Sequence, residues 1–371
     1  MRDEAPLYYN EPHDFYALSR FDDVKKCAAD WSTYISGRGS VLEFIKSNSK
    51  MPPGLILFED PPEHNFHRGL LSRVFHPKAM EAVEPDVRRF CEAALDPLVG
   101  GDGFDFIADL GAEMPMRTIG MLLGIPEADQ RGIRDQLDAG LKMTADPNLA
   151  AERPAFDMDF GGFFEYIDWR VDHPSDDLMT RLLNATFEDE NGETRTLTRQ
   201  EVGNFVGLLA GAGNETTTRL IGWAGKVLAE NADQRAELVA DPSLIAGAVE
   251  ELLRYEAPSP VQARYVTKTV EHHGQTVPEG SVMVLLNASA NRDERRFVDP
   301  DRFDIHRKGE HHVTFGYGIH FCLGAALARL EGRVALEEVL KRFPTWEVDW
   351  DNAVQAHTST VRGWEALPVF V

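Results

Sequence analysis

The ten residues FGYGIHFCLG, Phe315–Gly324, decide how the rest of the chain is interpreted. Gly316 and Gly318 allow tight or positive-φ backbone conformations that a Cβ atom would obstruct. The next segment, LGAALARLEGRVALEEVLKRF, repeats apolar residues at intervals of three and four and predicts a long amphipathic helix. Cys322 therefore sits at a helix N-terminus, where free amides and the helix dipole favour a thiolate. A thiolate is one of the ligands that hold haem iron.

An isolated cysteine of this kind could instead be a buried free thiol in a glycine-rich turn. The surrounding pattern F-x-x-G-x-x-x-C-x-G, however, resembles the haem-binding signature of the cytochrome P-450 family. It is met here by Phe315, Gly318, Cys322 and Gly324. The resemblance implies that Cys322 is the metal ligand, proximal to the iron of heme b (iron protoporphyrin IX). It also implies that Phe315 and the loop amides tune the sulfur, and that His320 points at a haem propionate.

Length and composition bound the alternatives. The 371 residues can form one large domain or two medium ones, and no repeat or low-complexity linker forces a split, so we expect a single domain, 1–371. No stretch approaches the roughly 20 apolar residues of a membrane span. The first residues, MRDEAPLYYN, lack the apolar core of a signal peptide.

Cysteine spacing and charge narrow the setting further. Cys27, Cys91 and Cys322 are far apart with no CxxC pair, which indicates a reducing compartment, and we expect a cytoplasmic protein. The net charge of −23 disfavours nucleic acid and anionic membrane surfaces as partners.

A PPEH run marks a second site. Asp60 as N-cap, Pro61 in the first turn and Glu63 as capping-box partner predict the start of a helix. His64 and Arg68 lie four residues apart on one face of it, which is ordinary for a surface pair. In the family, the helix after this run binds the haem propionates, and His64 and Arg68 match those positions. A buried porphyrin dianion needs such cations.

A long helix is predicted from the capping box of Thr198 and Glu201 to about Asn231, roughly 45 Å for about 30 residues. Its middle reads GAGNETTT, residues 211–218, where glycine and threonine are poor helix formers. A kink without chemistry would explain this.

The run A-G-x-E-T-T nevertheless resembles the oxygen-activation motif of the family, which bulges over the distal haem face. The resemblance implies that Ala212 and Gly213 lie against the haem, that Thr216 hydrogen-bonds dioxygen, and that Glu215 is the acid of a proton relay.

The pair Glu251 and Arg254 in E-x-x-R is weak evidence alone, since such pairs contribute only a few tenths of a kcal/mol, about 0.2–0.5. Its position before Pro300-Asp301-Arg302-Phe303 matches the family, in which both motifs form a buried network behind the haem. The resemblance assigns Glu251, Arg254 and Arg302 to this bracing role. Arg264, in a predicted strand, matches a propionate-binding arginine.

Several local elements can be predicted beside these motifs. We expect a β-hairpin over 5–20, a helix over 21–30, an irregular segment over about 31–59, and mostly helix from 80 to about 177. Short strands are expected over 261–266, 276–278 and 282–286, with a closing strand in 360–371.

Together the motifs imply a mainly α cytochrome P-450 fold, of the soluble bacterial type. The expected architecture is a triangular helical domain with a smaller β-rich region, and haem between the long central helix and the cysteine-loop helix. Relative to such members we expect the leading N-terminal helix to be absent.

The implied function is that of a haem-thiolate monooxygenase, which inserts one atom of O₂ into a hydrophobic small molecule. Electrons would come from a separate ferredoxin and its reductase, with Arg68, Arg73 and Lys78 as a docking patch on a monomer. The alternatives are a peroxide-driven peroxygenase and a non-catalytic haem-binding or sensing protein. By analogy the substrate pocket draws on 31–59, 156–164, Leu208, Leu209, Ala212, 261–262 and 358–361, with Arg38 or Lys46 as possible anchors for a carboxylate.

Overall fold

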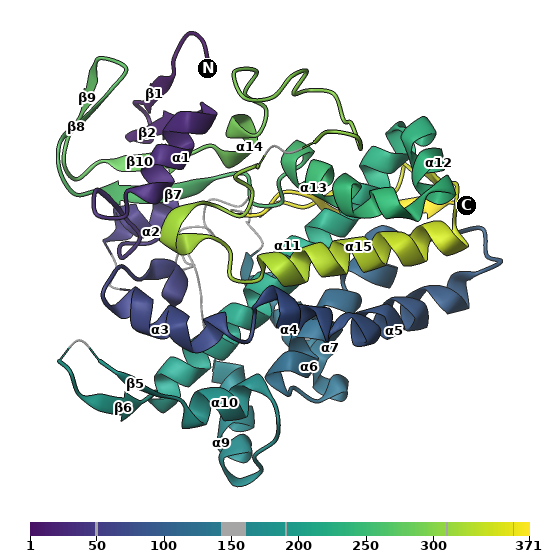
Figure 1. The fold of residues 1–371 in the computed structure, drawn as a ribbon, viewed down its shortest axis with the longest axis horizontal. Coiled ribbons are helices and arrows are strands. Elements are labelled where there is room, and N and C mark those ends of the chain that lie inside the picture. Colours follow the sequence, from purple (N-terminus) through teal and green to yellow (C-terminus); the bar gives the residue numbers. More distant parts are fainter. Residues whose placement is uncertain (49–50, 142–160, 190, 309–310, 359) are drawn as a thin grey trace.

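Helices form most of the protein, and a smaller β-rich region lies at one side of them (Figure 1). The computed structural model describes residues 1–48, 51–141, 161–189, 191–308, 311–358 and 360–371. The expected mainly α architecture with a minor β region is confirmed. The helices are α1 (Phe21–Ala29), α2 (Leu42–Ser47), α3 (Glu63–Ser72), α4 (Pro77–Glu81), α5 (Glu84–Leu95), α6 (Met114–Leu123), α7 (Glu127–Leu141), α9 (Phe164–Asp172), α10 (Leu178–Asn184), α11 (Arg199–Glu230), α12 (Ala232–Ala240), α13 (Ile245–Tyr255), α14 (Asn287–Ala290) and α15 (Ala325–Arg342).

Single turns and short strands connect these helices. The short turns are η1 (Ile56–Phe58), η2 (Asp96–Leu98), the π-helical η3 (Phe106–Gly111), η4 (Gly161–Phe163), η5 (Pro242–Leu244) and η6 (Gly318–His320). The strands are β1 (Leu7–Asn10), β2 (Phe15–Leu18), β3 (Tyr34–Ile35), β4 (Gly103–Asp105), β5 (Thr186–Glu188), β6 (Thr194–Thr196), β7 (Gln262–Val266), β8 (Val270–His272), β9 (Gln275–Val277), β10 (Val282–Leu285), β11 (Glu347–Val348), β12 (Val354–Gln355), β13 (Trp364–Ala366) and β14 (Pro368–Phe370).

The largest sheet has the order β1-β2-β10-β7-β3. The hairpin β1–β2 joins it through β2, which runs parallel to β10 with Tyr16 opposite Met283. A second sheet, β11-β14-β4, pairs the C-terminal strand with residues 103–105. The predicted N-terminal hairpin, the helix over 21–30 and the strands after 261 are therefore present. The segment 31–59, expected to be irregular, contains α2, β3 and η1.

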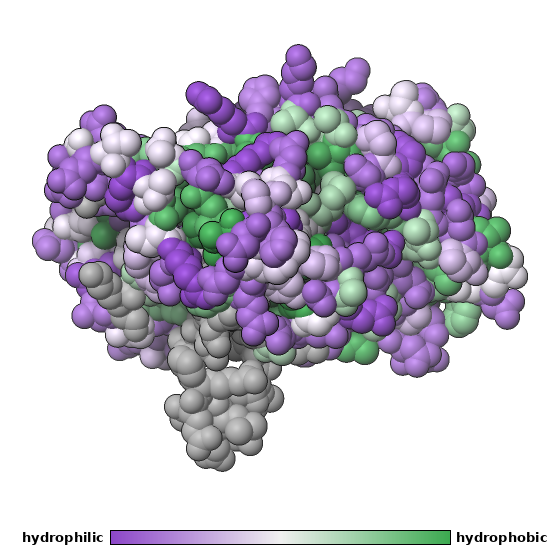
Figure 2. All heavy atoms as spheres, turned by 90° about the horizontal axis from the view of Figure 1, so that it is seen from below, coloured by the Kyte–Doolittle hydropathy of each residue, from purple (hydrophilic) through white to green (hydrophobic). Residues whose placement is uncertain are grey.

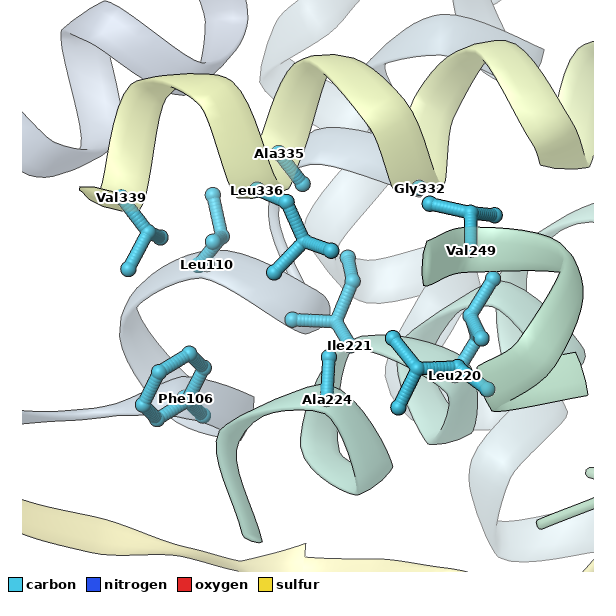
Figure 3. A pocket seen from close by; sticks show the side chains of 11 residues that line it. Phe106, Leu110, Leu220, Ile221, Ala224, Val249, Gly332, Ala335, Leu336 and Val339 are labelled. Atoms are coloured by element: carbon cyan, nitrogen blue, oxygen red, sulfur yellow. The ribbon is translucent and has the colours of Figure 1, made fainter. Parts of the chain in front are cut away.

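The main core lies where α11 and α15 cross the helical part. Figure 3 shows Leu336 and Ala335 of α15 on the side that faces Ile221 and Ala224 of α11, with Phe106 of η3 to the left of Ala224. A void of about 10 Å³ remains between these apolar side chains. It is at the lower limit for one water and offers that water no polar partners, so we expect it to stay dry.

Two predicted helix starts had different outcomes. The capping box of Thr198 and Glu201 is present at the start of α11, where each side chain accepts from the other residue's amide. The capping box at Asp60 was wrong, because α3 begins at Glu63 without a side-chain cap. The Asp60 carboxylate instead accepts hydrogen bonds from the amides of the loop before α2, at Ser36 (2.9 Å) and Gly37 (2.8 Å).

Hydrophilic side chains cover most of the face shown in Figure 2, with smaller hydrophobic groups between them. Within the described residues, none of the helices combines the length and apolar character required to cross a membrane.

Candidate functional site

A cavity of about 260 Å³ separates the middle of α11 from the loop that carries Cys322. Most of the residues singled out in the sequence line it. From one side these are Ala212, Gly213 and Thr216; from the other they are Arg68, Phe315, His320, Cys322 and Gly324. Segments more than 100 residues apart in the chain thus meet around one space, with the cysteine and the threonine hydroxyl among its walls.

The cysteine loop has the backbone that its glycines predict. Gly316 and Gly318 adopt φ of 71° and 76°, and a Cβ atom on Gly318 would lie 2.8 Å from the carbonyl oxygen of Ala28. The Cys322 amide donates to the Phe315 carbonyl at 2.8 Å, which closes the loop before α15. Gly324, the N-cap of α15, provides no side-chain cap, so the first amides of the helix are left for other acceptors.

The protonation of Cys322 departs from the expectation. Burial raises the pKa of its thiol above the ordinary value, although the Gly324 amide and the charges of Arg68 and Arg329 act in the opposite direction. The favourable contributions at the helix N-terminus therefore do not by themselves offset the burial of this thiol. A cation bound to the sulfur would supply the missing stabilisation.

Basic groups without acidic partners gather beside the cavity. Within the described part of the chain, neither ring nitrogen of the buried His64 has a hydrogen-bond partner, and its ring lies 4.5 Å from that of His320 in an edge-on contact. Burial lowers the pKa of His320 to about 2, with further contributions from the charges of Arg264, His64 and Arg68. The Nε2 atom of His320 is also unpaired in the described structure.

The two guanidinium groups show the same imbalance. Burial lowers the pKa of Arg264 to about 10, and its side chain donates to the Ala263 carbonyl and to the Gln262 side chain. Arg68 donates to the carbonyl of Phe321 at 2.5 Å, and burial lowers its pKa as well. Neither arginine forms an ion pair within the described ranges. These four basic residues fit a ligand that brings two carboxylates, as a porphyrin does.

The threonine and glutamate of the A-G-x-E-T-T run face different surroundings. Residues 211–218 are helical throughout, and the Thr216 hydroxyl, which lines the cavity, donates to the Ala212 carbonyl at 2.9 Å. Glu215 is buried, forms an ion pair with Arg219 at 2.8 Å and is not among the residues lining the cavity. Its carboxylate would have to leave Arg219 to act on a ligand there.

Glu331, which the sequence analysis missed, is an acid that, unlike Glu215, lines the cavity wall. Thr217 donates a hydrogen bond of 3.2 Å to its Oε2, while Oε1 has no partner in the described structure. Burial raises the pKa of this carboxyl to about 8, so it carries a proton at neutral pH. The signal that could have revealed it was an acidic residue on the apolar face of the helix after Cys322, a face that it shares with Glu338.

We expect stability to fall with pH because of Glu331, and Glu331→Gln to remove the effect. Its pKa in the folded state, about 8, exceeds the ordinary value of 4.5. The stabilisation by the bound proton is therefore complete below pH 4.5 and is lost as pH rises through 8. In urea unfolding, the free energy of unfolding of Glu331→Gln relative to that of the wild type should rise by about 1 kcal/mol or more between pH 5 and pH 8. A constant difference over this range would contradict the raised pKa.

The E-x-x-R network required one correction. Arg254 donates to both carboxylate oxygens of Glu251, at 2.7 and 2.8 Å, and all of this lies in the core. The second arginine on Glu251 is Arg307, with its Nε 3.1 Å from each oxygen. Arg302, assigned to this position by the resemblance, is exposed and pairs with Asp304. Only its backbone carbonyl enters the network.

The expected substrate wall is present in part. Ile56, Leu57, Leu208, Leu209 and Gln262 line the cavity. The other expected residues that the structure describes are not in its lining, namely 31–48, 51–55, 58–59, 161–164, Val261, Thr358, Thr360 and Val361. Phe156 and Phe160 lie outside the described residues.

The two possible carboxylate anchors have other contacts. Arg38 stacks on Tyr265 at 4.5 Å and hydrogen-bonds Asn48, while Lys46 lies 3.8 Å from Asp14. Neither lines the cavity.

Comparison with known proteins agrees with this geometry. The family model described as "Cytochrome P450" matches residues 239–361. The chain is 34% identical to "Cytochrome P450 107B1" of Saccharopolyspora erythraea, over 96% of this chain and 89% of the relative.

Solved structures extend the similarity to the whole fold. A mutant of P450 EryK in complex with erythromycin B is 33% identical with a TM-score of 0.90, covering 100% of this chain and 94% of that one. CYP109E1 from Bacillus megaterium in complex with testosterone is 30% identical with a TM-score of 0.90, covering 100% and 95%.

Proposed function

The chain belongs to the cytochrome P450 family of haem monooxygenases, and on that premise we propose that it inserts one atom of O₂ into a hydrophobic small molecule. A separate ferredoxin and its reductase would supply the electrons. The observation that carries the proposal is the meeting of Cys322 and Thr216 on one cavity, beside basic groups that have no acidic partner among the described residues. The basic groups, His64, Arg68, Arg264 and His320, fit the two propionates of heme b.

In this proposal Cys322 is the iron ligand, and His64, Arg68, Arg264 and His320 bind the propionates. When bound, the haem iron supplies the oxygen chemistry, and a thiolate ligand favours cleavage of the O–O bond. Ala212 and Gly213 line the side of the cavity formed by α11, and their small side chains leave room there for a ligand. Phe315 and the Gly324 amide surround the sulfur and tune it.

Cleavage of O₂ consumes protons, and the residues around Thr216 can deliver them. The Thr216 hydroxyl lies at the cavity wall and can pass a proton from its Oγ1. Glu331, protonated at neutral pH, holds a proton at the same cavity, whereas Glu215 must first part from Arg219. We propose Thr216 as the final donor and both acids as sources behind it.

Replacement Thr216→Val tests this role. With ferredoxin and reductase, we expect NADH oxidation to continue while the product formed per NADH falls about 10-fold or more and hydrogen peroxide rises. A compound that shifts the haem to high spin can serve as substrate. Thr218→Val is the matched control, because the Thr218 hydroxyl bonds to the Gly111 carbonyl and not to the cavity.

The same assay separates the alternatives. A peroxygenase would form product with hydrogen peroxide alone and lose little on Thr216→Val. A sensing protein would oxidise no compound in a broad screen. Either result would refute the proposed monooxygenation.

The substrate class follows from the apolar wall. Ile56, Leu57, Leu208 and Leu209 offer aliphatic contacts, and Gln262 is one of the polar groups in the same lining. Two structures similar to this one are complexes with erythromycin B and with testosterone. These observations support a hydrophobic substrate without selecting one compound.

We place the proposed ferredoxin at the surface around the cysteine loop. Arg73 and Lys78 are exposed there, and α4, which carries Lys78, contacts α15. Arg68 donates to the Phe321 carbonyl instead, so we no longer include it in the docking patch. Tyr317 and Phe321 add exposed aromatic rings, each 41% accessible. Cationic and aromatic groups suit an acidic partner.

We expect the double charge reversal Arg73→Glu with Lys78→Glu to slow ferredoxin-supported reduction about 10-fold at low salt, and less at high salt. Stopped-flow absorbance of the haem measures this rate. Reduction by dithionite should be unchanged. Arg89→Glu with Lys341→Glu, exposed charges far from the loop, is the control. An unchanged reduction rate in the Arg73→Glu, Lys78→Glu variant would mean that the ferredoxin does not bind at this surface.

A further inference from the structure

A buried ionic cluster lies between the cavity wall and the start of α11. We use this name for Glu59, His67, Glu201 and Arg195. The His67 Nδ1 lies 2.8 and 2.9 Å from the two oxygens of Glu59, and its Nε2 lies 3.9 Å from Oε1 of Glu201. Arg195 donates to both oxygens of Glu201 at 2.9 Å. His67 thus bridges two carboxylates.

Aromatic rings shield this cluster from water. Phe187 and Phe205 each contact the His67 ring edge-on at 5.5 Å, and Arg195 stacks on Phe187 at 4.5 Å. As whole residues, Glu59, His67 and Glu201 are at most 9% exposed, whereas the side chain of Arg195 is 33% exposed. Hydrogen bonds in such surroundings are stronger than in water, and leaving one unmade is costly. The buried ionic cluster therefore joins the loop before α3, α3 itself, the β5–β6 hairpin and α11 firmly.

The loop before α3 is attached to the same place by its backbone. Oε1 of Glu59 accepts from the Gly54 amide at 2.7 Å, and the Asn204 side chain on α11 donates to the Pro53 carbonyl at 2.7 Å. Gly54 has φ of 86°, and a Cβ atom there would lie 3.1 Å from the Cα of Glu201. This close approach favours glycine and seats the loop on the first turn of α11.

The residues that follow this anchor form part of the cavity wall. Ile56 and Leu57 line the cavity, together with Leu208 and Leu209 of α11. Their neighbours Leu55 and Phe58 are buried against Phe44 and Leu208. The polar side of the segment is thus fixed by the buried ionic cluster, and its apolar side presents Ile56 and Leu57 to a ligand.

We propose that His67 and Glu59 are positioning residues, which hold the Ile56–Leu57 wall in place before a ligand binds. They touch no ligand and act through the loop. Because the wall is already ordered, a ligand large enough to reach it binds without ordering it. Ligands confined to the haem iron gain nothing from this arrangement. The inference rests on the proposed function only in treating the cavity as the ligand site.

The test compares a large and a small haem ligand in His67→Leu. We expect the Kd of 4-phenylimidazole, from its difference spectrum, to rise about 10-fold, and the Kd of cyanide to change less than about 2-fold. Hydrogen exchange of the peptide 51–60 should accelerate in the same variant without haem ligand. A merely structural role would lower the melting temperature and leave the ratio of the two Kd values unchanged.

His272→Leu is the matched control, because His272 is also buried and hydrogen-bonded, to Tyr34 at 2.6 Å, but lies in the β-rich region. In His272→Leu, the hydrogen exchange of the peptide 51–60 and the ratio of the Kd values for 4-phenylimidazole and cyanide should equal those of the wild type. If His67→Leu does not fold, Glu59→Gln carries the test, with the same pattern at smaller size.

Equal weakening of both ligands, or unchanged exchange at 51–60, would overturn the proposal. If the variant still binds cyanide in either case, the proposed haem site is intact. Such a result would then contradict the positioning role alone and not the proposed function.

Discussion

Replacing Cys322 by serine is expected to abolish monooxygenation, with turnover falling at least about 100-fold, as for loss of an essential catalytic group. The carbon monoxide complex of the dithionite-reduced wild type should show the strongly red-shifted Soret band of a thiolate-ligated haem, and the variant should lack it. The reason is chemical: a serine hydroxyl cannot supply the electron density with which a thiolate favours O–O cleavage.

Two control variants make this result specific. Cys27 and Cys91 are buried away from the cavity, and burial raises the pKa of Cys27 to about 12. Cys27→Ser and Cys91→Ser should keep the red-shifted band. If Cys322→Ser kept it as well, another residue would be the ligand, and the assignment of the cysteine loop would be wrong.

Replacing Arg254 by leucine is expected to destabilise the fold by about 3–5 kcal/mol, because a buried carboxylate loses its principal partner. Arg254 donates to both oxygens of Glu251 and to the carbonyls of Asn291 and Pro300. These bonds join α13 to the segment that leads into the cysteine loop. We therefore also expect the variant to retain little haem after purification.

Arg302→Leu and Arg307→Leu turn this prediction into a test of the corrected network. Arg302 is exposed, so its loss should change the free energy of unfolding by less than about 1 kcal/mol. Arg307 contacts Glu251 directly, so Arg307→Leu should lower the free energy of unfolding clearly more than Arg302→Leu does. Urea unfolding measures all three variants. A larger effect for Arg302 than for Arg307 would restore the assignment made from the family resemblance.

Local sequence signals predicted local structure well. Gly316 and Gly318 take the positive φ that their spacing suggested, and Thr198 caps α11 together with Glu201. In both cases the deciding interactions lie within a few residues, so the sequence contains them. The grouping of Cys322 with Thr216 came instead from the family resemblance, since nothing local relates two residues so far apart.

The errors share one physical cause, competition from residues distant in the chain. Asp60 could cap its own helix, but the amides of Ser36 and Gly37 use its carboxylate instead. Arg302 and Arg307 lie in an irregular segment without periodicity, so spacing cannot tell which one reaches Glu251. Glu331 is on the buried face of a helix, where its surroundings and not its type raise its pKa.

The parallel pairing of β2 with β10 bears on how the protein is made. Tyr16 faces Met283, so the N-terminal hairpin leaves the ribosome long before its sheet partner exists. At about 5–20 residues per second, the delay is on the order of tens of seconds. An isolated two-stranded hairpin is barely stable in water. During synthesis Leu7 and Leu18, which are buried in the finished sheet, therefore depend on chaperones or transient contacts to avoid aggregation.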